Sequence, residues 1–275
     1  MVNGLRVLDR AALPAIAALC RRGIPEPPTF DELDDALFAA EQPAILRGDP
    51  QIGVVATVTG AAGAYVRLLV VDPDARGHGH GHTLMRAAEA DARAAGRRSV
   101  TIGADAPFFL WPGVPSGATA MLCLVERHRY TRVEANFDMT VDLAAIPDDP
   151  GGHSLATPDD HDELESWMAT HWPNWKAEVL RALGKGNLMI ARDDVGISAF
   201  CGFEVNRAGF LGPVAARPDL IGRRAGRPVL LGALHELRGR GRDHIEVTWV
   251  GPVVPYARVG GRVSSVYFVY RRELR

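Results

Sequence analysis

A glycine-rich stretch in the first third of the sequence has the composition of a phosphate-binding loop. It follows an apolar run, residues 64–71, and precedes a helix-forming segment. Glycine adopts backbone conformations that other residues avoid, and the first N–H groups of a helix have no partner within it. These N–H groups and the helix dipole favour an anion, to which an arginine side chain can add a charge-assisted contact. The stretch therefore predicts a site for a phosphate-bearing ligand, formed by Arg76, Gly77, His78, Gly79, His80, Gly81 and His82.

Other uses of this stretch are less favoured by its residues. A Walker phosphate loop is excluded because it needs a lysine followed by serine or threonine, where this sequence has His82 and Thr83. A dinucleotide fingerprint needs a glycine at position 82 and an acidic residue about 20 positions on, for which Asp105 is the candidate. A nucleotide-dependent oxidoreductase therefore stays open as a remote alternative. The three histidines of the loop alternate, but two stand between turn glycines, so we expect them to face solvent and expect no metal site.

Hydrophobic periodicity and chain-breaking residues predict the elements around this loop. The helix after it has an apolar stripe through Leu84, Ala88 and Ala92, and Gly96 closes it. Asp9 caps an earlier helix, and Thr157 before a proline starts a later one. The other predicted elements are a helix over 29–40 and strands over 52–58, 64–71, 188–191, 197–205 and 210–215. This order of helices and strands is typical of the mixed α/β classes.

The sequence contains an internal repeat with an offset of 145 residues. Residues 73–107 and 218–252 have nine identical positions, and Gly77 with Gly222 is one of them. A period of this length indicates a duplicated domain. Residues 146–152 are rich in chain breakers and lack periodic apolar residues, as in a linker. We therefore predict two domains, residues 1–145 and residues 153–275.

Composition and charge narrow the class of protein. The chain has 275 residues, 47% of them hydrophobic, and a formal net charge of -2, which favours a globular protein over a disordered chain and over a binder of duplex nucleic acid. No apolar run approaches the roughly 20 residues that cross a bilayer, and no signal-peptide core is evident. The three cysteines lack the spacing of a disulfide framework or a zinc site, and Cys123, in an apolar run, is expected to be buried. We expect a cytoplasmic protein without nucleic-acid or membrane partners.

Residues 71–81 resemble the acetyl-CoA motif of the Gcn5-related N-acetyltransferase (GNAT) superfamily. That motif follows a strand and consists of arginine or glutamine, two residues, glycine, one residue, and glycine or alanine. Arg76, Gly79 and Gly81 match it. The resemblance implies two tandem acyl-CoA N-acyltransferase (GNAT) domains of α/β class with a mixed, splayed sheet. It extends to a bacterial subgroup of tandem GNAT proteins through residues 108–115, 126–130, 138–143 and 249–260.

The resemblance also implies where acetyl-CoA lies and how it reacts. The pantetheine arm would lie along the strand at Leu69, Val70 and Val71, and the pyrophosphate would rest on residues 76–81. In this family an amine attacks the thioester directly and a strand N–H polarises the carbonyl. An acid, often tyrosine, protonates the departing thiolate.

The two copies depart from the family pattern in opposite ways. In the second copy, Ile221 replaces the arginine of the motif and Arg224 replaces its first glycine. Little or no cofactor binding is therefore expected there. Tyr256 occupies the family's acid position in the second copy, whereas Val125 does so in the first. Cofactor and tyrosine are therefore expected in different copies.

Candidate catalytic and acceptor-binding residues complete the prediction. Asp105, at the end of the strand after the loop helix, could accept the amine proton or merely cap a turn, and Tyr256 could be catalytic or a packed aromatic. Phe108, Phe109 and Trp111 could line an acceptor pocket or anchor a loop.

Together these residues predict an acetyl-CoA-dependent N-acetyltransferase. It would transfer an acetyl group to a primary amine of a small molecule, with acetyl-CoA as co-substrate in the first domain. A non-catalytic module that senses or sequesters acyl-CoA is the alternative, and the valine at position 125 favours it. Duplication could supply within one chain the pairing that other folds obtain by dimerising, so a monomer with an internal pseudo-dimer or a homodimer is expected.

Overall fold

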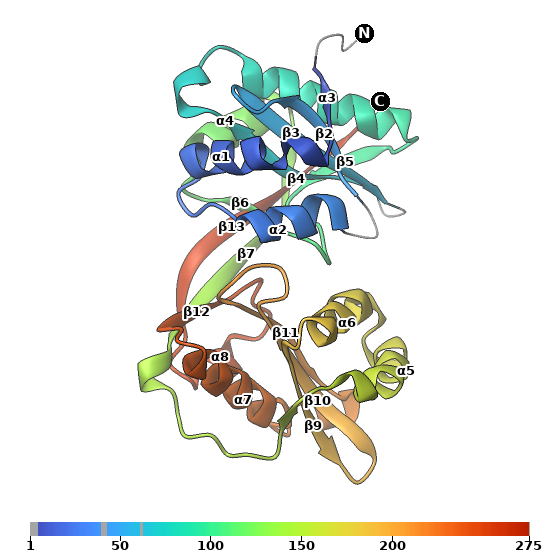
Figure 1. The fold of residues 1–275 in the computed structure, drawn as a ribbon, viewed down its shortest axis with the longest axis vertical. Helices are drawn as coiled ribbons and strands as arrows, with labels where there is room; N and C mark the ends of the chain where they lie inside the picture. Colours follow the sequence, from blue (N-terminus) through green and yellow to red (C-terminus); the bar gives the residue numbers. More distant parts are fainter. Residues whose placement is uncertain (1–4, 40–42, 61–62, 275) are drawn as a thin grey trace. The chain divides into compact units, whose positions relative to one another are not determined.

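The computed structural model describes residues 5–39, 43–60 and 63–274. The chain divides into two compact units, the first comprising Met1–Asn136 and Val266–Arg275 and the second Phe137–Ser265 (Figure 1). Each unit contains a mixed sheet covered by helices on both faces. The predicted α/β class is confirmed.

The sheet of the first unit is splayed between two parallel strands, β4 (Gly63–Val71) and β5 (Ser99–Ile102). These strands pair at only three positions, from Ala64 with Val100 to Val66 with Ile102. Beyond Val66, the edge of β4 that faces β5 has no strand partner within the described residues. The strand order of this unit is β1 (Val7–Leu8), β2 (Ile45–Asp49), β3 (Gly53–Gly60), β4, β5 and β13 (Arg262–Glu273), and β6 (Val114–Pro115) also pairs with β13.

Strand β4 has a bulge just where the splay begins. Ala56 of β3 lies opposite Leu68 and Thr57 opposite Val66, so Arg67 is an extra residue on the β4 side. A bulge of this kind bends a strand. The sequence therefore builds a local opening in the sheet next to the predicted pantetheine segment.

Helices cover the two faces of this sheet. Helices α1 (Leu13–Gly23) and α2 (Phe30–Asp34) pack against one face, which includes Leu68 and Val70. Helices α3 (His80–Ala94) and α4 (Thr119–Arg127) pack against the other, and the predicted apolar stripe of α3 is buried there.

Two predicted helix starts in this unit are confirmed, and one predicted helix is only partly correct. The Asp9 side chain accepts a hydrogen bond from the Ala11 N–H, and Thr29 with Glu32 forms a capping box. The helix predicted over 29–40 is a short α-helix followed by π-helical residues 35–39, and Ala40 lies outside the described residues.

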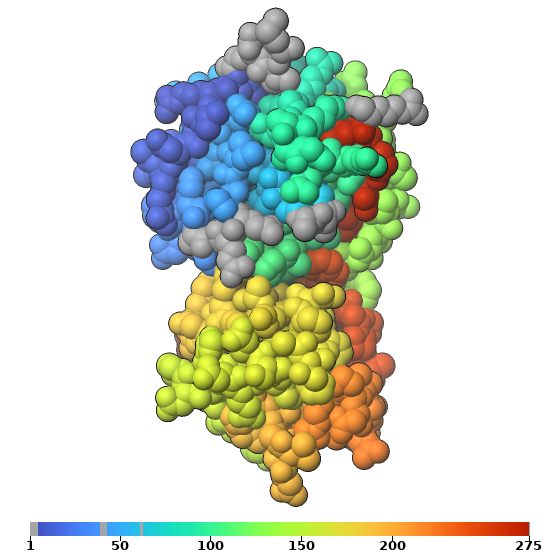
Figure 2. Space-filling view, turned by 90° about the vertical axis from the view of Figure 1, so that its right-hand side faces the viewer, coloured from blue at the N-terminus to red at the C-terminus, as the bar shows by residue number. Residues whose placement is uncertain are grey.

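The second unit repeats this plan. Helices α5 (His161–His171) and α6 (Lys176–Gly184) pack against one face of its sheet and are seen on its surface in Figure 2. Helix α7 (Gly226–Gly239) packs against the other face, and α8 (Val253–Ala257) is short. The strand order is β7 (Thr131–Asp142), β12 (His244–Val247), β11 (Phe210–Ala216), β10 (Gly196–Phe203), β9 (Leu188–Asp193) and β8 (Ser154–Leu155).

The duplication is visible in the backbone. Strand β12 lies 145 positions after β5, and residues 145 apart share left-handed backbone conformations. The φ angle is 83° at both Gly77 and Gly222 and 86° at Gly79 against 61° at Arg224. The second loop therefore keeps the backbone path of the first although its side chains differ.

The compact units do not coincide with the predicted ranges 1–145 and 153–275. Tyr270 and three neighbours in β13 pair with β5 of the first unit, while residues 139–142 of β7 pair with β12 of the second. Each unit is thus completed by a strand from the far side of the predicted linker. Residues 146–152 contain neither helix nor strand, as predicted for a linker.

Candidate functional site

The glycine-rich loop connects β4 to α3 through a short 3-10 turn. Asp72 caps this turn, residues 73–75, because its side chain accepts a hydrogen bond of 3.1 Å from the Asp74 N–H. Arg22 of α1 holds the same carboxylate through its Nε at 2.7 Å and lowers the pKa of Asp72, an effect that the Asp74 N–H reinforces. The path of the chain into the loop is therefore fixed by an ion pair.

The loop leaves a row of backbone N–H groups available. The first helical hydrogen bond of α3 runs from the Thr83 N–H to the Gly79 carbonyl at 3.1 Å. In the described part of the chain, the N–H groups of residues 77–82 have no backbone acceptor. A Cβ atom built at Gly77 or Gly79 would meet no heavy atom within 4 Å, so there is open space beside the main chain. The predicted anion cradle fits this geometry.

Arg76 is exposed, but its guanidinium already contacts the protein. Its Nη2 donates to the Gly23 carbonyl at 2.8 Å and its Nε to the Val71 carbonyl at 3.2 Å. These contacts tie the end of α1 to the end of β4. The remaining N–H groups of the guanidinium are the ones that could contact a ligand.

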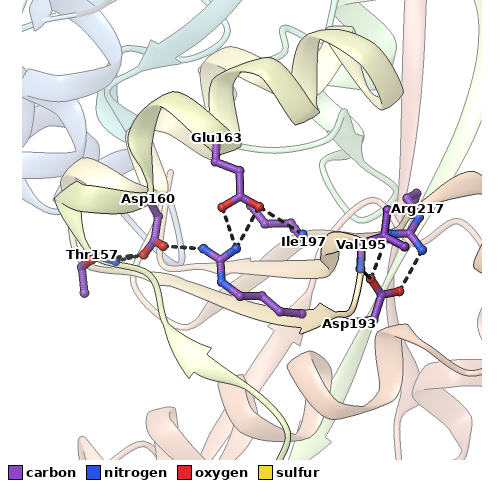
Figure 3. A network of polar contacts seen from close by, with 8 residues as sticks. Thr157, Asp160, Glu163, Asp193, Val195, Ile197 and Arg217 are labelled. Carbon is purple, nitrogen blue, oxygen red and sulfur yellow. Dashed lines mark hydrogen bonds and ion pairs between the residues drawn. The ribbon is translucent and has the colours of Figure 1, made fainter.

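The duplicated loop carries the opposite charge at its start. Arg217 stands 145 positions after Asp72 and pairs with Asp193 at 2.8 Å and with Asp219 at 2.8 Å. Asp193 also accepts a hydrogen bond from the Val195 N–H. Arg192 donates to both Asp160 and Glu163, and Figure 3 shows these contacts. The second loop is therefore held by a different ion-pair network.

A buried ion pair lies where β4 and β5 separate. Arg67 and Asp105 are 5% and 4% exposed, and the Arg67 Nε lies 2.5 Å from Asp105 Oδ2. The Arg67 guanidinium also donates to the Ala36 carbonyl and lies over the Phe108 ring at 5.5 Å. Burial raises the pKa of Asp105, and Arg67 offsets only part of that rise. Asp105, a candidate proton acceptor from the sequence, is therefore engaged by a cation and withdrawn from solvent.

His82 does not face solvent as predicted. Its Nδ1 lies 2.9 Å from Nε2 of His128, at the end of α4, and the two rings stack with centroids 5.0 Å apart. His128 in turn lies 3.3 Å from a carboxylate oxygen of Glu89. This row of contacts could not be predicted from the sequence, because His82 and His128 are 46 residues apart.

One family model matches the part of the chain that contains the glycine-rich loop. Residues 34–110 match the family model described as an acetyltransferase (GNAT) domain, and this match contains β4, the loop and α3. Residues 34–110 therefore form a GNAT domain. No curated protein matches the sequence.

Solved structures of GNAT proteins resemble both units together. The GCN5-related glucosamine N-acetyltransferase region of a fungal GH3 β-N-acetylglucosaminidase has a TM-score of 0.78 and 21% identity, over 98% of this chain and 38% of that longer one. A GCN5-related N-acetyltransferase from Sphaerobacter thermophilus has a TM-score of 0.72 and 21% identity, over 99% and 96% of the two chains. A tandem GNAT protein from the clavulanic acid pathway has a TM-score of 0.73 and 16% identity, over 98% of each chain. At these identities the likeness shows the tandem GNAT fold.

The predicted acceptor-binding aromatics follow β5 in this GNAT fold. Phe108 and Phe109 are 5% and 7% exposed, and the adjacent Leu110 is buried in the core under α1 and α2. Trp111 is half-buried against the same core. This burial favours the anchoring role for the two phenylalanines, and Trp111 keeps more of its surface accessible.

Tyr256 and Val125, for which the resemblance implies the acid position of the two copies, lie in different units. Tyr256 in α8 is 8% exposed, and burial raises the pKa of its phenol, with the buried Cys201 thiol adding to the effect. Val125 of α4 is fully buried in the first unit. Asp105 and the glycine-rich loop thus share one unit, and Tyr256 belongs to the other.

No group of three or more histidine, cysteine, aspartate or glutamate side chains in residues 5–39, 43–60 and 63–274 is placed to hold a metal ion. Among the helices that the structure describes, none is long and apolar enough to cross a membrane.

Proposed function

We propose that this GNAT protein is an acetyl-CoA-dependent N-acetyltransferase that acetylates a primary amine of a small molecule. The observation that carries the proposal is the loop of the first unit. Its N–H groups at residues 77–82 lack backbone acceptors in the described structure and surround two left-handed glycines with open space beside them. A coenzyme A diphosphate needs such a row of donors.

The neighbouring strand supplies what the rest of the cofactor needs. The β4 edge through Leu69, Val70 and Val71 is the part beyond the last pairing with β5, so its polar groups can bind the amide groups of a pantetheine arm. The bulge at Arg67 lies at the inner end of this edge, where the thioester would be. A strand N–H there would stabilise the charge that develops on the carbonyl oxygen.

The reaction breaks the carbon–sulfur bond of the thioester and forms a carbon–nitrogen bond to the amine. The amine loses a proton and the departing thiolate gains one. We assign neither transfer to Asp105. Taking up a proton would cancel the negative charge that pairs with the buried Arg67, and this favours a positioning role at the splay.

A coenzyme A sensor without turnover is the second candidate. The buried Val125 favours it, because no tyrosine stands at the acid position of the first unit. Release of free thiol in the presence of an amine panel separates the two functions. Tight binding with no thiol release above background across the panel would support the sensor.

The direct test is a thermal-shift screen followed by mass spectrometry. We expect acetyl-CoA to raise the melting temperature and expect a product heavier by one acetyl group from an amine mixture. Amino sugars belong in that mixture, because the fungal region with the same fold is named a glucosamine N-acetyltransferase. Stabilisation by NAD(P) and not by acetyl-CoA would replace the proposal with the oxidoreductase alternative.

The second unit is proposed to bind no acetyl-CoA. Its loop has the backbone of the first, but Arg224 places a long side chain at the position of Gly79. We further propose a cytoplasmic protein that is a monomer or a homodimer, and light scattering during gel filtration distinguishes these two states.

A further inference from the structure

His82 differs from the other two loop histidines in its contacts. The rings of His78 and His80 lie 6.5 Å apart and make no ring hydrogen bond within the described structure. His82 is half-buried, and its Nδ1 is hydrogen-bonded to Nε2 of His128 at 2.9 Å. One edge of its ring is thus fixed by the protein, while Nε2 has no partner among the described residues.

The contact continues inward to a buried carboxylate. His128 and Glu89 are 8% and 4% exposed, and His128 Nδ1 lies 3.3 Å from Glu89 Oε1. Arg272 of β13 donates to the same oxygen at 2.7 Å. Four side chains from α3, the end of α4 and β13 therefore form one line that ends at the first turn of α3.

The hydrogen-bond partners of the two histidines determine which ring nitrogen of each carries the proton. An ionised carboxylate only accepts hydrogen bonds, so His128 must carry its proton on Nδ1. Burial lowers the pKa of His128, the carboxylate opposes this in part, and His82 and Arg272 lower it further. A neutral His128 then has a bare Nε2, which must accept from the Nδ1–H of His82.

The side chains behind His82 carry no net charge. Glu89 and Arg272 neutralise each other at the inner end of the line. Tyr130 lies beside them, and burial raises the pKa of its phenol, with Glu89 adding to the rise and Arg272 and Arg93 opposing it, so it stays neutral. A proton gained at Nε2 of His82 would therefore place a net positive charge next to the N–H groups of residues 77–82.

We propose that His82 couples the binding of a coenzyme A phosphate group to the uptake of one proton. The phosphate would accept a hydrogen bond from Nε2–H of the charged ring, and His128 and Glu89 would act as positioning residues that hold the ring through Nδ1. The proton comes from solvent and returns to it on release. This inference rests on the proposed function, because it places the phosphate at the same loop.

The test is the affinity for coenzyme A, measured by titration calorimetry at pH 6 and pH 8 in two buffers of different ionisation enthalpy. Phosphate groups also titrate near pH 6, so the informative quantity is the difference between the protein and His82→Gln. We expect the gain in affinity from pH 8 to pH 6 to be about fivefold larger for the unaltered protein than for the variant. His161→Gln, which removes an exposed histidine of the second unit, should keep that gain.

The outcomes separate this inference from the proposed function. Equal gains and equal proton uptake in the protein and in His82→Gln would overturn the role of His82 while coenzyme A binding stands. No binding of coenzyme A at either pH would instead remove the proposed function itself.

The positioning role has its own readout that needs no variant. Nitrogen-15 shifts of the histidine rings should show His128 protonated at Nδ1 alone and His82 protonated at Nδ1. A His82 ring with its proton on Nε2 and a bare Nδ1 would contradict the arrangement.

Glu89→Gln should reduce the gain in coenzyme A affinity at low pH, with circular dichroism as the check that this variant is folded.

Discussion

Gly79 and Arg224 occupy equivalent places in the two loops, and both adopt a left-handed backbone, with φ of 86° and 61°. This conformation is easy for glycine and disfavoured by about 1–2 kcal/mol for other residues. The second loop thus keeps a strained conformation that the first loop obtains with glycine. The difference that matters for a ligand is the side chain, because the backbone path is shared.

Gly79→Arg should therefore abolish coenzyme A binding while leaving the first unit folded. The added side chain would enter the open space beside the loop, and the backbone strain should lower the free energy of unfolding by about 1–2 kcal/mol. Gly96→Arg is the matched control, since Gly96 also has a positive φ, 69°, and open space, but lies beyond the other end of α3. Calorimetric titration and urea unfolding of both variants measure the two effects. Unchanged binding in Gly79→Arg would show that the loop is not the site.

Tyr256→Phe should change turnover by less than about tenfold, because the proposed cofactor loop lies in the other unit. The phenol is buried, and its raised pKa reflects that burial. The measurement is kcat with an amine that the protein acetylates. A loss well above tenfold would assign the acid to the second unit and contradict the proposed division between the units.

The sequence predicts the loop residues but not their partners. Glycine spacing after an apolar strand is a local signal, and the helix predicted to follow it is α3, which begins at His80. The ion pairs near the loop join residues that are far apart in the chain: Arg67 and Asp105 are separated by 38 residues, and Glu89 and Arg272 by 183. A single sequence holds no signal for such pairs, because a buried ion pair requires only that the fold bring two charges together.

At the scale of the elements, periodic apolar residues predicted most of the structure around the loop. The sequence does not predict strand β2, because this strand is short and ends in Gly48 and Asp49. It also contains a charged residue, Arg47, whose side chain pairs with Asp91 of α3 at 2.7 Å. The burial predicted for Cys123 is wrong, since this residue is exposed on α4. Apolar composition alone does not say which side of a helix faces the core.

Helix α6 of the second unit contains a buried carboxyl group, Glu178. It is 6% exposed, and it accepts a hydrogen bond of 2.7 Å from the Asn206 side chain, which also accepts one from Arg181. Burial raises the pKa of Glu178 to about 7, against the smaller opposing effects of Arg181 and Asn206. The folded state therefore binds a proton that the unfolded state has released above pH of about 4.5.

Glu178→Gln should raise stability at pH 8 and change it little at pH 4. A group whose pKa is raised on folding stabilises the folded state at pH values below its pKa in the unfolded chain. This stabilisation is lost as the pH rises through its pKa in the folded state, which for Glu178 is about 7. The amide keeps the acceptor for Asn206 but has no charge, so we expect a gain of about 2–3 kcal/mol in the free energy of unfolding at pH 8. Urea unfolding at both pH values measures it. Glu134→Gln, at an exposed position of β7, serves as control, and an equal effect of the two variants would contradict the burial argument.

For the whole molecule, the repeat located the two copies but not the exchange of their last strands. The offset of 145 residues aligns β5 with β12 and the two loops. It carries no information on which sheet receives β13, because an alternating strand fits either of two related sheets equally well. In the structure β13 pairs with β5, with Tyr270 opposite Ile102 and Arg272 opposite Val100.

The fragment 1–145, which the sequence predicts to be a domain, should therefore fail to fold on its own. Without β13 it would expose the edge of β5, lose the buried Val269 and Tyr270, and leave Glu89 without Arg272. An open edge and an unpaired buried charge are both strongly unfavourable. Circular dichroism should show no cooperative thermal transition for the fragment, and adding the peptide 262–275 in excess should restore one. A fragment 1–145 with the Tm of the full chain would show that β13 is dispensable to the first unit, because its pairing with β5 would then contribute nothing measurable to stability.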